Sequence, residues 1–347
     1  MTECDAVVVH DGTIHPGGAV DVVLEAARAL DSDLVIGVSG MSKSWWVKRA
    51  PNDVRVLKFV NKRSTLRDAL LARKMLKLDL TEYNLVLTSG PAAKFYQTYD
   101  DQTRYHYLHH PPLPSLWFDG RLFSYLVKTV DRIETWAIEG VICNSELTAQ
   151  RCVTQYGREP DAVVNPPVDV ECFRTDRERE RGSVVMVGRL EMRKRVELAV
   201  DAFDDIGEVN GQIPQLHLLG DGPLRRTIES RAPENVHVHG FVSDDELMRR
   251  VETAEAGLFL AKREDFGITP IEYRAAGTTV VGVDEPNTSN QIIDNKTGTL
   301  IHPDVSSVKT GIRRALTSDW DRDRIREAST AYGVAAFRTG LVDAVRP

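Results

Sequence analysis

The sequence lacks the features of a membrane-spanning or exported protein. No window approaches about 18 uninterrupted apolar residues, so we expect no membrane-spanning helix. The first residues run straight into a short apolar strand without a basic segment, so we expect no signal peptide. Cysteine is scarce and shows no C-x-x-C spacing, so we expect reduced packing residues of a cytosolic protein and no metal site. The four cysteines are Cys4, Cys143, Cys152 and Cys172.

What the chain does contain is enough apolar sequence for two domains of ordinary size. Of its 347 residues, 42% are hydrophobic and 27% are charged, which is typical of a globular protein in water. A chain of this length usually divides into two domains, each with its own core. We place an N-terminal domain at residues 1–170, a charged linker at 171–182 and a C-terminal domain at 183–323.

The opening segment is typical of a doubly wound sheet. Residues 5–9 form an apolar strand, a loop with Gly17 and Gly18 follows, and residues 19–30 carry apolar side chains at helical spacing. Strand, glycine loop and helix form the first unit of a Rossmann-like domain. The two glycines either serve a binding loop or only make a tight turn, and the residues alone leave both readings open.

Residues 41–80 are strongly basic within an acidic chain. They hold eleven Lys or Arg and three Asp, a local charge of +8 in a chain whose net charge is −7. They also contain Trp45, Trp46 and a predicted amphipathic helix. The apolar positions of that helix are Leu66, Leu70, Leu71, Met75 and Leu78. Two readings stay open: these side chains pack into the core, or the segment meets an anionic membrane surface.

Two histidines follow the predicted strand Y-H-Y-L. His109 and His110 precede Pro111 and Pro112, whose fixed backbone angles would hold the loop in one conformation. A loop histidine is more often structural than catalytic, although an imidazole can exchange a proton near neutral pH. The residues alone leave both roles open for His109.

The second half opens with cations behind a strand. The strand S-V-V-M-V leads into a glycine turn and two spaced cations, Arg189 and Lys194. Surface cations are mostly just solvated. Cations placed here would also suit a reaction in which negative charge develops on a leaving group.

The segment L-A-K-R-E-D-F-G-I-T-P-I-E-Y-R-A-A-G follows another predicted strand. Gly267 allows close backbone approach to a ligand, and Thr269 with Pro270 predicts a helix start. Free amides at such a start favour an anion such as phosphate. Glu272 is either a ligand-binding residue or the capping-box partner of Thr269, and the residues alone leave both open.

This segment resembles the family 4 retaining glycosyltransferases of the GT-B fold, through its strand, its E-x7-E with F-G inside, and the A-A-G-T-T-V-V that follows. The resemblance implies an α/β fold of two Rossmann-like domains facing one another across a cleft, with a terminal helix, residues 324–347, returning towards the first domain. It implies that Glu264 lies beside the donor sugar and that Glu272 binds the ribose hydroxyls. The turn residues implied to contact the donor diphosphate are Phe266, Gly267 and Ile268.

Other segments extend the resemblance. G-R-L-x-x-x-K implies that Arg189 and Lys194 neutralise the donor diphosphate. H-x-P implies that His109 serves the reacting centre, and Y-L-H-H-P is especially similar to enzymes that mannosylate lipid-linked oligosaccharides. The remaining implied contacts are Gly17 and Gly18 in an acceptor or phosphate loop and Phe241 and Val242 beside the nucleobase.

The sequence departs from the family in two places. Asn287 to Gln291 stand where Gly-Gly-x-x-Glu is usual, which puts the sugar contacts there in doubt. Tyr273 and Arg274 replace the small and apolar residues usual after the second Glu, which puts the local packing in doubt.

The resemblance implies a retaining hexosyltransferase that uses a nucleotide diphosphate sugar and an acceptor hydroxyl, with a lipid-linked glycan as the acceptor. We expect no cofactor, no metal and no nucleic acid, and a cytoplasmic protein peripheral to an anionic membrane. A glycosidase would need carboxylates that converge across a bond, which one loop and the next helical turn do not provide. A non-enzymatic nucleotide-sugar or nucleic-acid binder is the alternative, although Trp45 and Trp46 are not interleaved with cations as base-stacking residues are.

Overall fold

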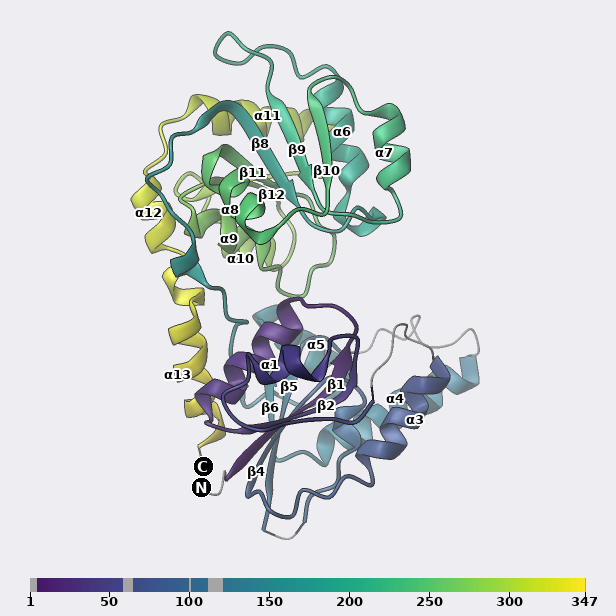
Figure 1. Ribbon diagram of the computed structural model, residues 1–347. Coiled ribbons are helices and arrows are strands. Elements are labelled where there is room, and N and C mark those ends of the chain that lie inside the picture. Colours follow the sequence, from purple (N-terminus) through teal and green to yellow (C-terminus); the bar gives the residue numbers. More distant parts are fainter. Residues whose placement is uncertain (1–4, 59–64, 100, 112–120, 347) are drawn as a thin grey trace. The chain divides into compact units, whose positions relative to one another are not determined.

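A computed structural model describes residues 5–58, 65–99, 101–111 and 121–346, with only the backbone for 65–69 and 121–128. The chain forms two compact units (Figure 1). Unit 1 consists of Met1–Pro167 together with Val334–Pro347, and unit 2 of Val168–Gly333. Each unit is a parallel sheet flanked by helices, which confirms the predicted pair of Rossmann-like α/β domains.

Unit 1 is built on a seven-stranded parallel sheet in the order β3-β2-β1-β4-β5-β6-β7. Because β1 lies between β2 and β4, the strand order reverses there, and ligands bind beyond the carboxyl ends at such a point in open α/β sheets. The strands are β1 (Ala6–Thr13), β2 (Asp33–Ser39), β3 (Val54–Val56), β4 (Leu85–Ser89), β5 (Thr103–Leu108), β6 (Gly140–Cys143) and β7 (Ala162–Val163).

Alternating side chains of β1 bury both faces of this sheet. Val8 packs in one core with helix α1, whereas Val7 and Val9 pack in another with helix α3. A strand covered on both faces reads as a continuous apolar run, as V-V-V does here. The helices are α1 (Gly18–Ala29), α2 (Lys43–Val47), α3 (Thr65–Met75), η1 (Ala93–Phe95), α4 (Arg121–Trp136), α5 (Glu146–Tyr156) and α13 (Val334–Val345).

Helix α13 completes unit 1 from the far end of the chain. Its Phe337 and Leu341 are buried against the α1 side of the sheet, and Arg338 forms an ion pair of 2.6 Å with Glu25 of α1. The helix expected over residues 324–347 is therefore shorter and begins at Val334, because α12 (Arg322–Glu327) and η5 (Thr330–Tyr332) precede it in unit 2.

The basic segment sends several of its apolar side chains into the core, whereas the cations that the structure describes there stay exposed. Trp46 is fully buried and its indole N–H donates to the Ser39 hydroxyl at 2.8 Å. In and beyond α3, Leu71, Met75 and Leu78 are buried, whereas Leu70 is 51% exposed. The side chain of Leu66 lies outside the described part of the chain. The expected single apolar face is therefore divided between core and surface.

Unit 2 contains a six-stranded parallel sheet in the order β10-β9-β8-β11-β12-β13. Its first strand begins at Glu180, so the linker expected over 171–182 is partly strand, and Gly182 takes a φ of 68° within it. The strands are β8 (Glu180–Val187), β9 (Gln215–Leu219), β10 (Val236–Gly240), β11 (Ala254–Phe259), β12 (Thr279–Val283) and β13 (Gly298–Ile301).

Two apolar clusters cover the two faces of this sheet. Val184 of β8 belongs to one cluster and its neighbour Val185 to the other, as expected for a strand buried on both faces. In the described part of the chain, no helix is both long and apolar enough to cross a membrane. The unit 2 helices besides α12 and η5 are η3 (Val170–Cys172), η4 (Met192–Lys194), α6 (Val196–Asp204), α7 (Arg225–Arg231), α8 (Asp244–Thr253), α9 (Thr269–Ala275), α10 (Thr288–Gln291) and α11 (Val305–Thr317).

Candidate active site

The polar residues singled out in unit 2 gather where its strand order reverses. Strand β8 lies between β9 and β11, so the carboxyl ends of β8 and β11 are adjacent. The segment after β8 carries Arg189 and Lys194, and the segment after β11 carries Glu264 and the Phe266-Gly267 turn. The backbone joins the two segments, since the Lys262 N–H donates to the Arg193 carbonyl at 2.7 Å.

Lys194 and Glu264 form the centre of this site. The Lys194 ammonium lies 2.7 Å from a Glu264 carboxylate oxygen, and both side chains are about one-fifth exposed. The ammonium also lies 5.7 Å from the centre of the Phe259 ring. A partly buried cation beside an accessible carboxylate can bind an anion on one side and a hydroxyl-rich group on the other.

Arg189 and Arg195 differ in their surroundings. The Arg189 side chain is 68% exposed, with Glu191 3.3 Å away, so it is available at the surface. Arg195, which the sequence analysis did not single out, donates to the Leu260 carbonyl at 3.0 Å and pairs with Glu285 at 2.5 Å. It fixes the end of β11 to the segment after β12.

The Phe266-Gly267 turn depends on its glycine and on a buried ring. Gly267 has a φ of 80°, and a Cβ there would meet the Phe259 ring at 2.9 Å. The Phe266 side chain is buried against Tyr332, so only its backbone can meet a ligand. In the described part of the chain, no acceptor takes the amide hydrogens of Gly267 and Ile268. These amides can bind an anion.

Two amide side chains from α10 and its start hold this turn. The Asn287 side-chain NH₂ donates to the carbonyls of Asp265 (2.8 Å) and Phe266 (2.5 Å). The Gln291 NH₂ donates to the carbonyls of Phe266 (2.8 Å) and Gly267 (3.1 Å). The segment that departs from the family therefore supports the turn from behind. The sequence offered no signal for this role, because the contacts join segments more than twenty residues apart.

The start of α9 differs from the expectation. Ile268 occupies the N-cap and Thr269 is the first helical residue, so the expected Thr269 N-cap, on which the capping box depended, is wrong. Glu272 is half-buried in the first turn.

Tyr273 and Arg274, the unusual residues after Glu272, have structural partners. The Tyr273 hydroxyl accepts the Val187 N–H at 2.8 Å, and its ring lies over Gly257, where a Cβ would clash. The Arg274 guanidinium is buried and donates to the carbonyls of Gln291 (2.6 Å) and Ala328. Both residues therefore stabilise the packing around α9 rather than disturb it.

Phe241 and Val242 follow β10 at the same edge of the sheet. Phe241 is 86% exposed, an unusual setting for a large apolar ring, whereas Val242 packs partly against the core. Ser243 then caps α8, accepting the Glu246 N–H at 3.3 Å.

In unit 1, His109 immediately follows β5 and is joined to the neighbouring strands. Its Nε2 lies 2.9 Å from the hydroxyl of Ser89, at the end of β4, and that hydroxyl lies 3.2 Å from Nδ1 of His10 in β1. His10 was expected in a loop, but β1 continues through it to Thr13. One hydroxyl hydrogen can serve only one ring, so Ser89 donates to one histidine and accepts from the other.

The surroundings of His109 keep its imidazole neutral. Burial lowers its pKa to about 3, and the positive charge that His10 and His110 can carry adds to this effect. The ring also meets the Tyr107 ring edge to face, with centroids 5.1 Å apart. Pro111 is buried beside it, whereas Pro112 lies outside the described residues.

The glycine loop after β1 shows no steric need for glycine at Gly17. Gly17 is the N-cap of α1 with extended backbone, and a Cβ there would contact nothing within 4 Å. Gly12 and Gly40, by contrast, lie against backbone atoms that a Cβ would meet at 2.3 and 2.1 Å. The tight turn alone therefore does not explain Gly17.

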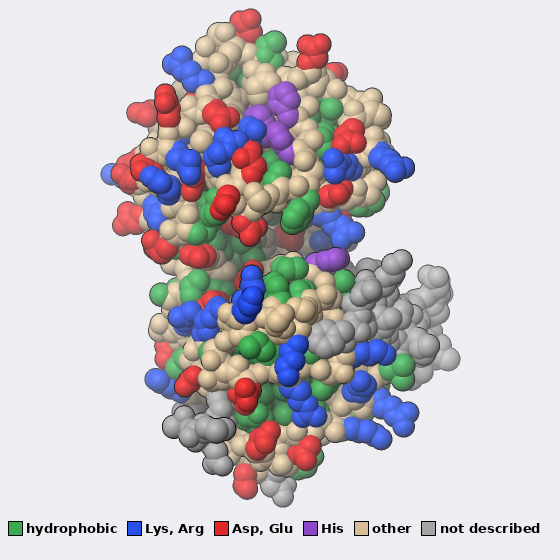
Figure 2. Space-filling model, viewed as in Figure 1, with side chains coloured by type: hydrophobic (Ala, Val, Ile, Leu, Met, Phe, Trp, Pro, Cys, Tyr) green, Lys and Arg blue, Asp and Glu red, His purple; other side chains and the backbone are tan. Residues whose placement is uncertain are grey.

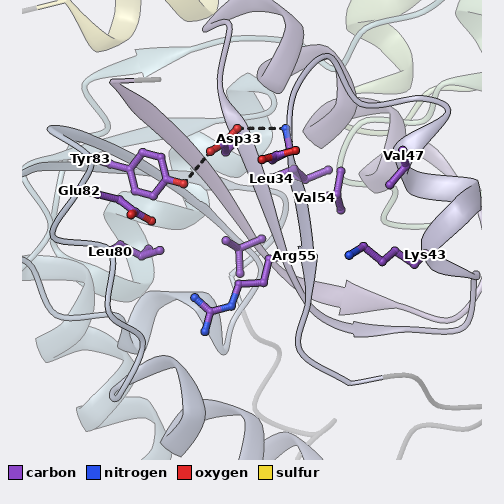
Figure 3. Close-up of a pocket in the computed structure, with 11 residues that line it drawn as sticks. Asp33, Leu34, Lys43, Val47, Val54, Arg55, Leu80, Glu82 and Tyr83 are labelled. Atoms are coloured by element: carbon purple, nitrogen blue, oxygen red, sulfur yellow. Dashed lines mark hydrogen bonds between the residues drawn. The ribbon is translucent and has the colours of Figure 1, made fainter. Parts of the chain in front are cut away.

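A separate pocket of about 360 Å³ lies at the amino ends of β2 and β3 (Figure 3). Asp33 lines this pocket and accepts the Tyr83 hydroxyl at 2.7 Å and the Asp53 N–H at 3.1 Å. Its carboxylate and burial raise the pKa of Tyr83. Because the pocket lies opposite the carboxyl edge and Asp33 already has hydrogen-bond partners, we assign it no part in the chemistry.

Among the described residues, no group of three or more His, Cys, Asp or Glu side chains is arranged to hold a metal ion. Arg189 and Lys194 are two of the positive side chains at the unit 2 site.

Comparison with known proteins agrees with this fold. Residues 171–332, nearly the whole of unit 2, match the family described as Glycosyl transferases group 1. The match lies in the unit that carries Lys194 and Glu264, and unit 2 is thus similar to group 1 glycosyl transferase domains. Across 98% of this chain and 99% of the other, the chain is similar to the Anabaena protein HepE crystallised with UDP-glucose, with a TM-score of 0.78 and 16% identity. That likeness shows the two-domain GT-B fold.

Two curated relatives are similar over part of their length. One is a D-inositol 3-phosphate glycosyltransferase of Mycolicibacterium gilvum, 26% identical over 59% of this chain and 52% of the relative. The other is an alpha-monoglucosyldiacylglycerol synthase of Streptococcus pneumoniae, 22% identical over 58% of this chain and 50% of the relative. The matched part thus spans about half the length of each relative.

Proposed function

We propose that this protein is a retaining hexosyltransferase that moves a sugar from a nucleotide diphosphate to an acceptor hydroxyl. One observation carries the proposal: the Lys194–Glu264 ion pair stands beside the open amides of Gly267 and Ile268, where the strand order of unit 2 reverses. A cation and free amides suit a diphosphate, and a carboxylate suits sugar hydroxyls. The matched family and the UDP-glucose complex of HepE support the donor class.

Each residue has a distinct role in this reaction. Lys194, the exposed Arg189 and the turn amides stabilise the diphosphate as it leaves with its negative charge. Glu264 binds the sugar and Glu272 the ribose. His109 serves the reacting centre as a neutral imidazole, a form that its lowered pKa of about 3 maintains. Further contacts are Gly17 and Gly18 with the acceptor and Phe241 and Val242 with the nucleobase.

No metal takes part in the proposed reaction, because the cations already supply the charge that a divalent ion would bring. The acceptor in this proposal is a lipid-linked glycan, and the protein works in the cytoplasm at an anionic membrane surface. The synthase relative, whose name includes a diacylglycerol product, supports a lipid acceptor. The exposed cations of α3, rather than the buried Trp46, support binding to an anionic membrane surface.

The decisive experiment measures sugar transfer together with donor binding. Thermal unfolding is followed with GDP, UDP and inorganic phosphate, since a ligand specific to the folded state raises its stability. Purified protein is then incubated with GDP-mannose or UDP-glucose and short lipid phosphate glycans, and products are analysed for anomeric configuration. An inverted product would contradict the retaining mechanism. Binding without hydrolysis or transfer of any donor would favour a non-enzymatic nucleotide-sugar binder.

Vesicle co-sedimentation tests the membrane proposal separately. The protein should sediment with anionic vesicles and remain soluble with neutral ones, and added salt should weaken the association, since Lys and Arg attract anionic lipid by about 1 kcal/mol each. Equal behaviour with both vesicle types would exclude it.

A further inference from the structure

A second hollow in unit 1, which we call the α3 groove, lies between α3 and the carboxyl ends of β2 and β3. It encloses about 470 Å³. Figure 2 shows Lys and Arg side chains gathered on the part of unit 1 that Figure 1 gives to α3. The strand residues that line it lie towards the carboxyl ends of β2 and β3, the edge of the sheet that also carries Gly17 and His109.

The charged residues that line the groove are all cations. They are Arg55, Lys58, Arg73, Lys74 and Lys77. All five are exposed, and within the described part of the chain none has a carboxylate at ion-pair distance. This contrasts with unit 2, where most arginines near the sheet are paired. Like charges held together repel, so the groove favours an anion that carries more than one negative charge.

The floor and rim of the groove are apolar. Leu71 and Leu78 are buried beneath it, Leu57 is half-buried, and Leu70 is 51% exposed at its rim. A free phosphate ion would leave this apolar surface uncovered, whereas a hydrocarbon chain would remove it from water. Among the described residues that line the groove there is no aromatic ring on which a nucleic-acid base could stack.

We propose that the α3 groove binds the phosphate of the lipid-linked acceptor together with the first carbons of its hydrocarbon chain. The inference rests on the proposed function, whose acceptor it locates. Strands β2 and β3 lie three and four strands from β5, so the groove is about 15–20 Å across the sheet from His109. That span leaves room for a short glycan between the bound phosphate and the reacting hydroxyl.

Calorimetry on the full chain tests this, with decyl phosphate, inorganic phosphate and decyl maltoside, each below its micelle concentration. Decyl phosphate should bind, and the other two should bind at least tenfold more weakly. The double variant R73Q/K74Q should weaken the binding of decyl phosphate about 25-fold, since each cation near a lipid phosphate contributes about fivefold. Leu70→Gln should weaken it several-fold. Lys48→Gln, an exposed cation of the same basic segment outside the groove, should bind as the unaltered chain does.

Three outcomes would overturn the inference. Equal binding of inorganic phosphate would reduce the groove to an anion site, and equal binding of decyl maltoside would reduce it to an apolar one. Groove variants that behave like Lys48→Gln would place the ligand elsewhere. Since the variants change exposed side chains, unaltered thermal unfolding should accompany them. If the protein transfers sugar but does not bind decyl phosphate, the proposed role of the groove is refuted and the proposed function stands. If it binds decyl phosphate but transfers no sugar, the proposed function is refuted and the groove remains a lipid phosphate site.

Discussion

The Lys194 ammonium has two neighbours, the carboxylate of Glu264 and the face of the Phe259 ring. A departing diphosphate would share this ammonium with Glu264. The positive charge of Lys194 would therefore stabilise the diphosphate most as the bond to the sugar breaks. Lys194→Ala should therefore lower turnover about 100-fold or more, as is typical when one stabiliser of developing charge is lost. Initial rates with saturating donor measure this. Arg193→Ala, which removes an exposed neighbouring cation, is the control and should stay near the normal rate.

Ser89 gives a second prediction for single side chains. Its hydroxyl links His109 to His10 and so fixes which nitrogen of His109 carries hydrogen. Ser89→Ala should lower turnover about fivefold with little change in donor affinity, because one buried hydrogen bond contributes about 1 kcal/mol. Thr88→Val removes the equivalent bond to the buried His106, 2.9 Å long, and should affect stability rather than rate. Equal loss of rate in both variants would contradict a special role for Ser89.

Site residues that belong to short sequence motifs could be predicted, whereas the residues that support them in space could not. Lys194, Glu264 and Gly267 stand in short motifs, so sequence alone could single them out and the structure brings them together. Asn287 and Arg195 act through contacts to carbonyls of distant segments. No spacing in the sequence reveals such contacts, because they depend on which loops the sheet places side by side.

At the scale of elements, α10 supports the turn that offers its amides to the donor. Gln291 bonds the carbonyls of both Phe266 and Gly267 from within this short helix. Gln291→Met keeps the volume but leaves buried carbonyls short of a donor, so it should weaken nucleoside diphosphate binding about tenfold. Titration with GDP or UDP measures this. Asn290→Ala alters an exposed position of the same helix and should bind normally.

Strands β9 and β10 carry three histidines whose rings lie close together, with His217 stacked on His237, and Figure 2 shows a histidine patch on unit 2. Nδ1 of His217 lies 3.0 Å from Nε2 of His239. Burial, and after it the positive charge of Arg250, lowers the pKa of His217 to about 4. Between pH 6.5 and 4 the unfolded chain therefore binds the proton more readily than the folded one. The free energy of unfolding should fall as the pH drops through this range.

Urea unfolding at pH 7, 5.5 and 4.5 tests the histidine prediction. His217→Gln should flatten the dependence on pH, because the proton uptake that accompanies unfolding is removed. His302→Gln, an exposed histidine of the same unit, should leave the dependence as it was. Identical slopes in all three proteins would contradict the assignment.

Helices and strands were predicted best where a single sequence pattern indicates them. A continuous apolar run predicts a strand buried on both faces, and the strands predicted before Gly188 and Lys262 are both present. The sequence did not predict which apolar residues of α3 are buried, because they are spread over more of the helix surface than one face. Tertiary packing decided this, burying Leu71 and leaving Leu70 exposed. The sequence cannot make that choice, since it depends on where β2 and η1 lie.

For the whole molecule, the expected absence of a metal requirement remains to be tested. Transfer rates should be the same in the presence of EDTA and of added Mg²⁺ or Mn²⁺, because Arg189 and Lys194 supply the positive charge at the donor site. Rates measured after dialysis against EDTA decide this. Loss of activity that Mn²⁺ or Mg²⁺ restores would contradict it.

Unit 1 is assembled from chain on both sides of unit 2, since α13 packs with α1. A ribosome releases α13 only after the whole of unit 2 has been made, so the apolar surface that receives Phe337 and Leu341 stays uncovered until then. Domains usually fold in the order in which they are synthesised. Here unit 2, a continuous stretch, can finish folding before unit 1, although unit 1 begins first. A nascent chain of this protein therefore carries an exposed apolar surface for most of its synthesis, which is where a chaperone would bind.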